Sequence, residues 1–402
     1  MALMPVADAY AAVLKDTAAL PEETVALTEA YHRTLARDIA ALRTQPPEAM
    51  SAMDGYAVRA ADAVAGARLT VIGEVAAGRP FSDTVGAGQA ARIFTGGVVP
   101  GGADAVVIQE DTTRDGDHVA INESIVAGKN IRPAGIDFRE GDVLLARGTL
   151  LSDRAVALAA GMNHPRLPVH RRPRVGILAT GDELVAPGSV LGPGQIISSN
   201  AFALVALAQS EGAEAIDLGV ARDTLDSTTS GIRRARDLGV DVLVTTGGAS
   251  VGDHDLVQVA LKAEGVEMAF WRIALRPGKP MMHGRLGALR VLGLPGNPVS
   301  SYICGYLFLV PLIRALSGRT QVDHAFEHGV LGGDLPANDM RQDYLRARLS
   351  PGADGLPVAT SVGMQDSSLA ANLAAADALI VRPPFAPAAP AGSRCTLIRL
   401  PR

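Results

Sequence analysis

Between residues 174 and 318, short apolar runs alternate with stretches of helical periodicity, and this alternation restricts the fold more than any other feature of the chain. The expected strands are 175–179, 215–220, 240–245 and 291–294, and the expected helices are 201–211, 224–238, 254–264 and 299–316. Gly212, Gly239 and Gly265 stand where three of these helices should end. Strands that alternate with helices of this length predict βαβ units and a doubly wound, mainly parallel sheet. In such sheets, ligands bind beyond the carboxyl ends of the strands.

The remainder of the chain shows three further helical patterns. One begins near Val6 and ends before Pro21, and a second covers 28–37. A third helix is expected over 150–161, where Ser152 is the expected N-cap. These segments flank the region with the most strand-like sequence.

Residues 42–142 read as short alternating strands with Gly and Asp turns, which predicts a β-rich insertion. Strands at 345–349, 378–382 and 395–400 predict a small C-terminal β domain. The expected architecture is α/β and multidomain. Its expected parts are a discontinuous mixed α/β domain (20–43 plus 140–172), the β-rich insertion domain (44–139), the doubly wound domain (1–19 plus 173–320) and the C-terminal β domain (321–402).

Composition excludes several classes of function. A hydrophobic content of 48% and a charged content of 20% describe a folded soluble protein. The net charge is −5 and no Lys/Arg run with interleaved aromatic residues occurs, which argues against a nucleic-acid partner. The longest apolar stretch, 302–316, contains Pro311 and is shorter than the roughly 18 to 20 residues of a membrane span. With no signal peptide recognisable, a cytoplasmic location without a membrane partner is expected.

Neither a zinc site nor a disulfide framework is expected. Cys304 and Cys395 have no CxxC spacing, and a buried inert thiol is the expected state of each. The eight histidines are scattered and form no HExxH motif.

Acidic residues follow three of the expected strands. They are Asp182 and Glu183, then Asp223, then Asp253 and Asp255. Any one of them could simply cap the following helix. Together, converging carboxylates repel one another unless a cation joins them, and an oxygen-only cluster selects Mg²⁺. Mg²⁺ completes its shell with water and phosphate oxygens, which implies a nucleotide-like ligand.

Glycine turns stand at two of the same strand ends. Gly247-Gly248 and Pro295-Gly296-Asn297 each connect a strand to a helix start, where free N–H groups and the helix dipole favour an anion. The alternative is that they only make tight turns. Beside carboxylates that bind Mg²⁺, they predict a phosphoanhydride site.

A cationic set comprises Arg272, Arg276, Lys279 and Arg346. Guanidinium groups suit rigid oxyanions because they donate two hydrogen bonds in one plane. If Arg272 and Arg276 lie on one straight strand, both point to the same face and could bind one tetrahedral anion. The alternative is that these are ordinary surface arginines.

Asp54 follows the Pro46-Pro47 loop and precedes Gly55, and Asp-Gly is also the commonest two-residue hairpin turn. Its segment, 51–58, is the first of six motifs in order along the chain. The others are 95–97, 180–183, 246–255, 276–280 and 294–298. This ordered set resembles the molybdopterin molybdenumtransferases, the family that includes the gephyrin E domain, from Asp54 to Ser367.

The resemblance implies insertion of molybdenum from molybdate into adenylylated molybdopterin, with Mg²⁺-assisted cleavage of the phosphoanhydride and release of AMP. It implies a molybdopterin-binding-like doubly wound domain in an elongated molecule of four subdomains. It also implies a homodimer with active sites between the chains. An adenylyltransferase that supplies the substrate, and a molybdoenzyme or cofactor carrier that receives the product, are possible partners.

Motif positions give each expected site residue a role. The expected catalytic residues are Asp54, Thr95, Glu183, Asp223 and Asp255, of which Asp54, Asp223 and Asp255 would bind Mg²⁺. The expected substrate-binding residues are Arg132, Asp137, Gly247, Gly248, Ser250, Lys279, Pro295, Gly296 and Asn297. Arg272, Arg276, Arg346 and Ser367 are expected to bind molybdate. Relatives commonly carry Lys at 272 and 276, so the Arg side chains here change the reach and geometry of the oxyanion contacts.

Two other functions remain open. A molybdopterin adenylyltransferase, or another phosphoanhydride hydrolase, would use a domain like 174–318 but would lack the Asp54 and Thr95 motifs and the C-terminal domain. A scaffold is the non-enzymatic alternative, because gephyrin-like proteins cluster receptors through this module. Intact acids at the motif positions favour the enzyme.

Overall fold

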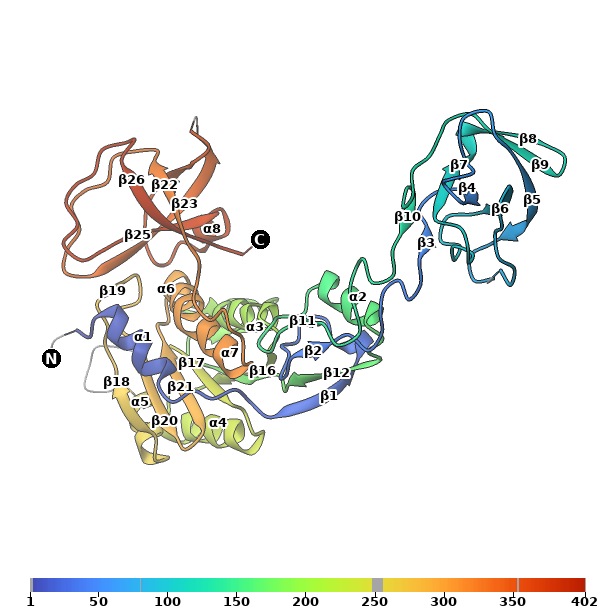
Figure 1. Ribbon diagram of the computed structural model, residues 1–402. Coiled ribbons are helices and arrows are strands. Elements are labelled where there is room, and N and C mark those ends of the chain that lie inside the picture. Colours follow the sequence, from blue (N-terminus) through green and yellow to red (C-terminus); the bar gives the residue numbers. More distant parts are fainter. Residues whose placement is uncertain (1–2, 80, 248–255, 353, 402) are drawn as a thin grey trace.

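The structure is a computed structural model that describes residues 3–79, 81–247, 256–352 and 354–401. Its parts are strung into an elongated molecule (Figure 1). A doubly wound α/β domain and a C-terminal β barrel lie together at one end. A small mixed domain connects them to a β-rich insertion domain at the far end. The multidomain α/β architecture expected from the sequence is thus confirmed.

The doubly wound domain is built on a six-stranded sheet. In spatial order its strands are β16 (Glu214–Ala221), β13 (Arg174–Thr180), β17 (Val242–Thr246), β21 (Leu289–Leu294), β20 (Met282–Leu286) and β18 (Glu267–Phe270). The first four are parallel, and β20 and β18 add an antiparallel edge. Parallel strands are buried on both faces, which explains why β13, β17 and β21 are mostly apolar and buried along nearly their whole length.

Helices cover both faces of this sheet. One face carries α1 (Val6–Leu14), α3 (Asn200–Ser210), α6 (Pro298–Cys304) and α7 (Val310–Leu316), and the other carries α4 (Leu225–Asp237) and α5 (Leu256–Ala263). A π-helical turn, η3 (Gly305–Leu309), joins α6 to α7. The resulting helix, Pro298–Leu316, is long and apolar enough to cross a membrane, but 83% of its most apolar window is buried in the domain. It is a core helix.

The mixed domain has its own apolar core around α2 (Asp153–Gly161). Its strand pairs are β1 (Glu22–Ala26) with β12 (Arg166–His170) and β2 (Ile39–Ala40) with β11 (Val143–Leu145). Ser152 caps α2 by accepting a hydrogen bond from the Ala155 backbone N–H at 3.2 Å, as predicted. The predicted helix over 28–37 is wrong, because only η1 (Leu27–Glu29) turns there. Thr34 and Leu35 form β-bridges to Leu150 and Val169 instead.

The insertion domain contains a six-stranded sheet. Its order is β7 (Ala105–Ile108), β4 (Gly55–Val58), β6 (Gln89–Ile93), β5 (Arg68–Val75), β9 (His118–Ile121) and β8 (Thr112–Asp115). A pair of short strands, β3 (Met50–Ser51) and β10 (Ile131–Arg132), forms the neck that leads to the mixed domain (Figure 1).

The C-terminal domain is a closed barrel, because β23 pairs with both β24 and β25. Its strands are β22 (Phe326–Leu331), β23 (Gln342–Pro351), β24 (Pro357–Ser361), β25 (Ala378–Arg382) and β26 (Arg394–Arg399), with a short helix α8 (Ala370–Ala374). One further strand, β19 (Leu275–Arg276), joins this sheet beside β23 although its sequence neighbours belong to the doubly wound domain.

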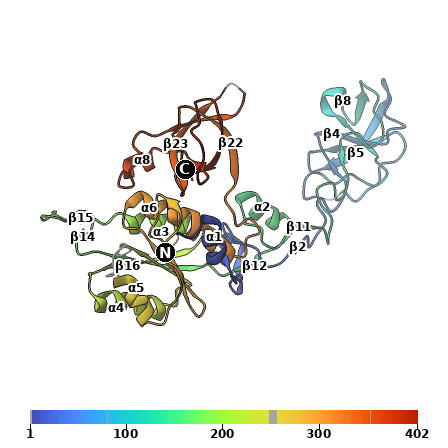
Figure 2. The ribbon, with the colours of Figure 1, turned by 90° about the vertical axis from the view of Figure 1, so that its left-hand side faces the viewer.

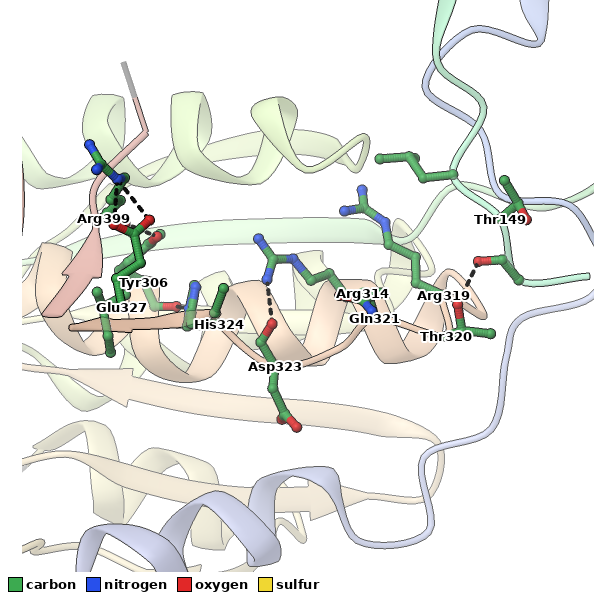
Figure 3. Close-up of a pocket in the computed structure, with 14 residues that line it drawn as sticks. Thr149, Tyr306, Arg314, Arg319, Thr320, Gln321, Asp323, His324, Glu327 and Arg399 are labelled. Atoms are coloured by element: carbon green, nitrogen blue, oxygen red, sulfur yellow. Dashed lines mark hydrogen bonds and ion pairs between the residues drawn. The ribbon is translucent and has the colours of Figure 1, made fainter. Parts of the chain in front are cut away.

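Polar contacts fix the junction that follows α7 (Figure 3). Arg314 donates to the carbonyl oxygen of Asp323 at 3.3 Å. The ring centroids of His324 and Tyr306 are 4.0 Å apart. The Nε2 atom of His324 lies 2.7 Å from the Tyr306 carbonyl oxygen. The Tyr306 hydroxyl donates to the Arg399 carbonyl at 2.6 Å, so one residue of the buried helix contacts both the linker and the barrel.

Candidate active site

The four parallel strands end at one edge of the sheet, where a pocket of about 440 Å³ opens. Its lining residues are Thr180, Glu183, Leu184, Ile196, Ile197, Ser198, Ser199, Asn200, Thr246, Gly247, Gly296, Asn297, Pro298 and Ser368. Glu183, Gly247, Gly296 and Asn297 are therefore brought together as predicted. This is the edge at which doubly wound folds bind ligands.

Glycine is required at one of the turns. Gly247 has φ of +89°, and a Cβ on it would lie 2.3 Å from the Thr180 carbonyl oxygen. A Cβ on Gly296 would approach the Gly247 Cα at 3.5 Å, so the two turns lie against each other. Position 247 therefore requires glycine, whereas a Cβ at position 296 would make only an ordinary van der Waals contact.

Two helices begin at this pocket. Asn297 stands at the N-cap of α6 and Ser199 at that of α3, and neither side chain caps its own helix. The Asn200 side chain instead donates to the Gly296 carbonyl at 2.7 Å, and the Asn297 side chain donates to the Ser367 hydroxyl at 2.8 Å. Both helix N-termini border the pocket, and their dipoles favour phosphate there. At α6, Pro298 has no N–H and the Val299 N–H donates to the Ser367 carbonyl at 3.0 Å.

Two of the predicted acids lie beside each other at the same edge. The Asp182 N–H donates to an Asp223 carboxylate oxygen at 3.4 Å, and the Asp223 N–H donates to Asp182 at 3.2 Å. These reciprocal bonds hold both exposed carboxylates at the ends of β13 and β16. Gly248, Ser250, Asp253 and Asp255 lie outside the described residues, so the third predicted acidic position has no structural account.

The acidic pair fits Mg²⁺ by its chemistry. Both donors are carboxylate oxygens, and Mg²⁺ needs only one or two when phosphate and water complete its shell. Within 3–79, 81–247, 256–352 and 354–401, no group of three or more His, Cys, Asp or Glu side chains could hold a metal by itself. The site therefore suits an ion that arrives with a phosphate ligand.

Arg276 does not share a strand with Arg272, and the prediction that both lie on one straight strand is wrong. β18 ends at Phe270, whereas Arg276 lies on β19 in the other sheet. The Arg276 guanidinium is engaged by the side chains of Asp343, Asp339 and Asn338. Hydrogen bonding to Asp343 raises the pKa of Arg276, so this side chain remains a cation.

Arg346 and Ser367 lie on the barrel side of α6. The Arg346 side chain, 1% exposed, donates to the carbonyl oxygens of Asp366 at 3.0 Å and Met364 at 3.3 Å. Its Nε has no hydrogen-bond partner within the described part of the chain. The Ser367 carbonyl accepts from the Val299 N–H at 3.0 Å, which places this loop against the start of α6. Lys279 is exposed after β19.

In the insertion domain, hydrogen bonds from Thr95 fix the position of the Asp54 carboxylate. Both the N–H and the hydroxyl of Thr95 donate to one Asp54 oxygen, at 2.7 and 2.8 Å, and they lower the pKa of this carboxyl. Gly55 does not form a hairpin turn but begins β4, where a Cβ would lie 1.9 Å from the Val107 carbonyl oxygen. The Asp-Gly sequence therefore exposes an acid at the start of a buried strand.

The remaining predicted residues lie between this acid and the mixed domain. Arg132 pairs with Met50 on β10 and β3, and the Asp137 N–H donates to the Gln45 carbonyl at 3.1 Å. Figure 1 shows the insertion domain far from the doubly wound domain of the same chain. One chain thus brings together the pocket residues, but not Asp54, Thr95, Arg132 and Asp137 with them.

Comparison with known proteins assigns the family. Residues 4–162 match the MoeA N-terminal region (domain I and II), 176–315 match a probable molybdopterin binding domain, and 328–400 match the MoeA C-terminal region (domain IV). A molybdopterin molybdenumtransferase of Haemophilus influenzae is 35% identical over 89% of this chain and 89% of its own length. One of Bacillus subtilis is 36% identical over 90% of this chain and 86% of its own. The chain belongs to the molybdopterin molybdenumtransferase family.

Solved structures agree with the family assignment. A molybdopterin biosynthesis MoeA protein from Pyrococcus horikoshii OT3 has a TM-score of 0.84 at 27% identity and covers 99% of this chain and 100% of its own. A second crystal structure of a Pyrococcus MoeA protein has a TM-score of 0.83 at 31% identity and covers 99% of each chain.

Sequence reasoning missed several pocket residues of this molybdenumtransferase-family chain. Ser198 enters the pocket from the segment before α3, Asn200 enters from the first turn of α3, and Ser368 enters from the barrel. A Ser-Ser-Asn run at a helix start was a usable signal, because Ser and Asn are N-cap residues. Nothing local marks Ser368, whose position depends on how the barrel docks.

Proposed function

We propose that this chain inserts molybdenum from molybdate into adenylylated molybdopterin, with Mg²⁺-assisted release of AMP. The observation that carries the proposal is the strand-edge pocket, which the N-termini of α3 and α6 and the turns at Gly247 and Gly296 border. The pair Asp182 and Asp223 lies at the same edge of the sheet. In a family of molybdenumtransferases, that combination suits a phosphoanhydride with its cation.

The pocket residues would have separate roles in the reaction. Gly247 and Gly296 admit the phosphates to the exposed N–H groups, and Asn297 orients the start of α6. Asp223, with Asp54 of a second chain, would hold Mg²⁺, which supplies charge neutralisation at the phosphoanhydride. Water would attack the phosphorus on the molybdopterin side and form a new P–O bond, while the P–O bond from that phosphorus to the bridging oxygen breaks. AMP would leave with the bridging oxygen, molybdopterin would keep a phosphate, and the protons of the water would pass to solvent.

The proposed molybdate site is the cationic set of Arg276, Lys279 and Arg346 with Ser367 beside α6. Arg272 lies after another strand, so the proposal for this residue rests on the family resemblance alone. A molybdate ion would have to compete with Asp343 for the Arg276 guanidinium.

The active site is proposed to be shared in a homodimer, because Asp54 and Asp223 lie in distant domains. A cytoplasmic location and transfer of substrate and product to other cofactor-pathway proteins belong to the same proposal. An adenylyltransferase is less favoured, since regions matching domains I, II and IV accompany the molybdopterin-binding domain.

Replacing Asp223 tests the proposed chemistry. Asp223→Asn should slow molybdate-dependent AMP release by at least about a hundredfold, because a cation ligand at the phosphoanhydride is lost. Asp237→Asn is the matched control, since it removes the same charge at the opposite end of α4. AMP release by Asp223→Asn at the parent rate would contradict the role of Asp223.

A further inference from the structure

The sheet of the insertion domain sets the position of Asp54. Figure 2 shows this domain, with β4, β5 and β8 labelled, apart from the other domains of the chain. Asp54 directly precedes β4, which lies between β6 and β7 in the sheet and is antiparallel to both. The start of β4 is therefore beside the ends of β6 and β7, which Thr95 and Gln109 follow.

Both of these neighbouring strand ends hold Asp54. The Thr95 N–H and hydroxyl donate to its carboxylate at 2.7 and 2.8 Å. The Gln109 N–H donates to its carbonyl oxygen at 3.0 Å. The geometry of this acid thus depends on how three strand ends are fixed relative to one another.

One side chain, that of Arg92 on β6, connects the three strand ends. Its Nη1 donates to the Gly55 carbonyl oxygen at 3.1 Å, and its Nη2 donates to the Gln109 side-chain oxygen at 2.7 Å. Gly55 is the residue after Asp54, and Gln109 is the residue whose N–H holds the Asp54 carbonyl. A guanidinium can make both bonds because it presents several N–H donors in one rigid plane.

Two aromatic rings hold the guanidinium itself. Its Cζ lies 5.2 Å from the centroid of the Tyr56 ring and 4.9 Å from that of the Phe94 ring, which are cation–π contacts. Tyr56 pairs directly with Arg92 across β4 and β6, so the two side chains lie on the same face of the sheet. Phe94 directly precedes Thr95, and its contact with Arg92 therefore also fixes the segment that holds Asp54.

Arg92 also brings a positive charge close to Asp54. The two Thr95 hydrogen bonds contribute most to the lowered pKa of Asp54, and the charge of Arg92 lowers it further. Two other acids lie near this arginine. Glu74 is its register partner on β5, and Glu110 follows β7 by two residues. Both are exposed, so water screens their charges.

We propose that Arg92 is a positioning residue for the reaction, which holds the start of β4 and the ends of β6 and β7 together so that Asp54 and Thr95 keep a fixed geometry. This inference rests on the role proposed above for Asp54. Arg92 acts through Asp54 and Thr95 and not on the substrate. The competing explanations are a purely structural role in the sheet and a direct contact with the substrate.

Arg92→Met tests the proposal, because it keeps the length of the side chain but removes its charge and both hydrogen bonds. The kcat of molybdate-dependent AMP release should fall by about tenfold to a hundredfold, since a displaced catalytic group loses rate. The KM for the substrate should stay within about threefold of the parent value, because no substrate contact is lost. In a carbon-13 NMR titration, the Asp54 carboxyl should titrate at higher pH, since a nearby positive charge is gone.

Arg92→Lys separates the geometry from the charge. Lysine keeps a positive charge, but its single ammonium cannot reproduce the two bonds that the planar guanidinium makes to Gly55 and Gln109. The Asp54 titration should therefore return toward that of the parent, whereas kcat should recover only in part. Full recovery of kcat in Arg92→Lys would show that charge alone matters and would overturn the proposal.

Two further variants keep the test decisive. Arg68→Met is the matched control, because Arg68 lies on β5 of the same sheet and forms an exposed pair with Asp115. It should change neither kcat nor the Asp54 titration. Gln109→Ala removes one acceptor of Arg92 from an exposed side chain, so the fold should persist, and kcat should fall by a smaller factor than in Arg92→Met. If Arg92→Met fails to fold, a parent kcat in Gln109→Ala would overturn the proposal.

The outcomes distinguish the competing explanations. A folded Arg92→Met chain with the parent kcat would leave Arg92 a purely structural role and overturn the inference. A raised KM with an unmoved Asp54 titration would indicate direct contact with the substrate and also overturn it. The NMR titration needs no molybdenum chemistry, so an Asp54 titration that moves in Arg92→Met and returns in Arg92→Lys, in a protein whose parent releases no AMP, would contradict the proposed reaction alone.

Discussion

At the scale of single residues, the pair Asp54 and Thr95 is the most informative. Two hydrogen bonds from Thr95 stabilise the charged carboxylate and lower its pKa. Asp54 is only partly exposed, but the two hydrogen bonds lower its pKa by more than burial raises it. A carboxylate with a lowered pKa stays ionised to more acidic pH and is available to bind a cation.

Thr95→Val should raise the pKa of Asp54, because the hydroxyl donor is lost while the backbone donor remains. The acidic limb of AMP release should shift to higher pH in the same direction, since Asp54 would be protonated sooner as pH falls. Carbon-13 NMR titration of the Asp54 carboxyl measures the shift directly. Thr113→Val, on β8 of the same domain, is the control, and an unmoved Asp54 titration would refute this account.

Gly247 shows how a backbone requirement builds a site. Gly247→Ala should destabilise the fold by more than the roughly 1–2 kcal/mol of a left-handed non-glycine residue, because the new Cβ also meets the Thr180 carbonyl oxygen. Gly287→Ala separates the two effects, since Gly287 has φ of +59° with nothing within 4 Å of a Cβ. Urea unfolding should rank Gly247→Ala clearly below Gly287→Ala, and equal losses would show that the contact is relieved at little cost.

At the scale of elements, the doubly wound region was predictable because its strands are mostly apolar and three of its helices end shortly before a glycine. The four expected strands of this sheet differ from the observed ones by one or two residues at their ends, and strand 378–382 of the barrel coincides with β25. The helix expected over 28–37 fails because strand partners distant in the sequence engage Thr34 and Leu35. Local periodicity carries no information about such partners.

The error over Arg272 and Arg276 has the same physical origin. β19 is only two residues long and exists because it pairs with β23, some 67 positions later in the chain. A strand of two residues is too short to show a hydrophobic pattern that would predict this pairing. The pocket motifs were readable because glycine and acidic residues at strand ends act locally, whereas Ser368 and Arg276 are placed by docking of the barrel.

The Arg276–Asp343 pair should hold β19 to the barrel. Asp343→Asn should lower the free energy of unfolding by about 1–3 kcal/mol, since the Asp343 side chain is nearly buried and its charge-assisted hydrogen bond is lost. Asp115→Asn breaks the exposed pair with Arg68 and should cost less than about 1 kcal/mol. Chemical unfolding measures the loss of unfolding free energy in both variants. A loss for Asp343→Asn no larger than that for Asp115→Asn would contradict the role of the Arg276–Asp343 pair in holding β19 to the barrel.

At the scale of the whole molecule, side-chain contacts fix the start of the linker that leads from the doubly wound domain to the barrel. Glu211 at the end of α3 accepts hydrogen bonds from Arg314 at 2.7 Å and from Arg319 at 2.7 Å. Burial opposes its charge, but these two guanidinium groups prevail and lower the pKa of Glu211. The doubly wound domain and the start of the linker are thereby held together beside the barrel.

The elongated shape has a functional consequence. A rigid chain that keeps Asp54 far from Asp223 can complete the proposed site only by association with a second copy. A C₂ dimer would then complete two equivalent sites, each with an insertion domain from one chain and a pocket from the other.

Complementation between two inactive chains tests this shared site most directly. Asp54→Ala and Asp223→Ala should each abolish molybdate-dependent AMP release as homodimers. When equal amounts are mixed and exchange is complete, half of the dimers are mixed and each has one intact site, so about a quarter of the parent activity should return. No recovered AMP release in a dimer demonstrated to contain both chains would contradict the shared site and place the chemistry within a single chain.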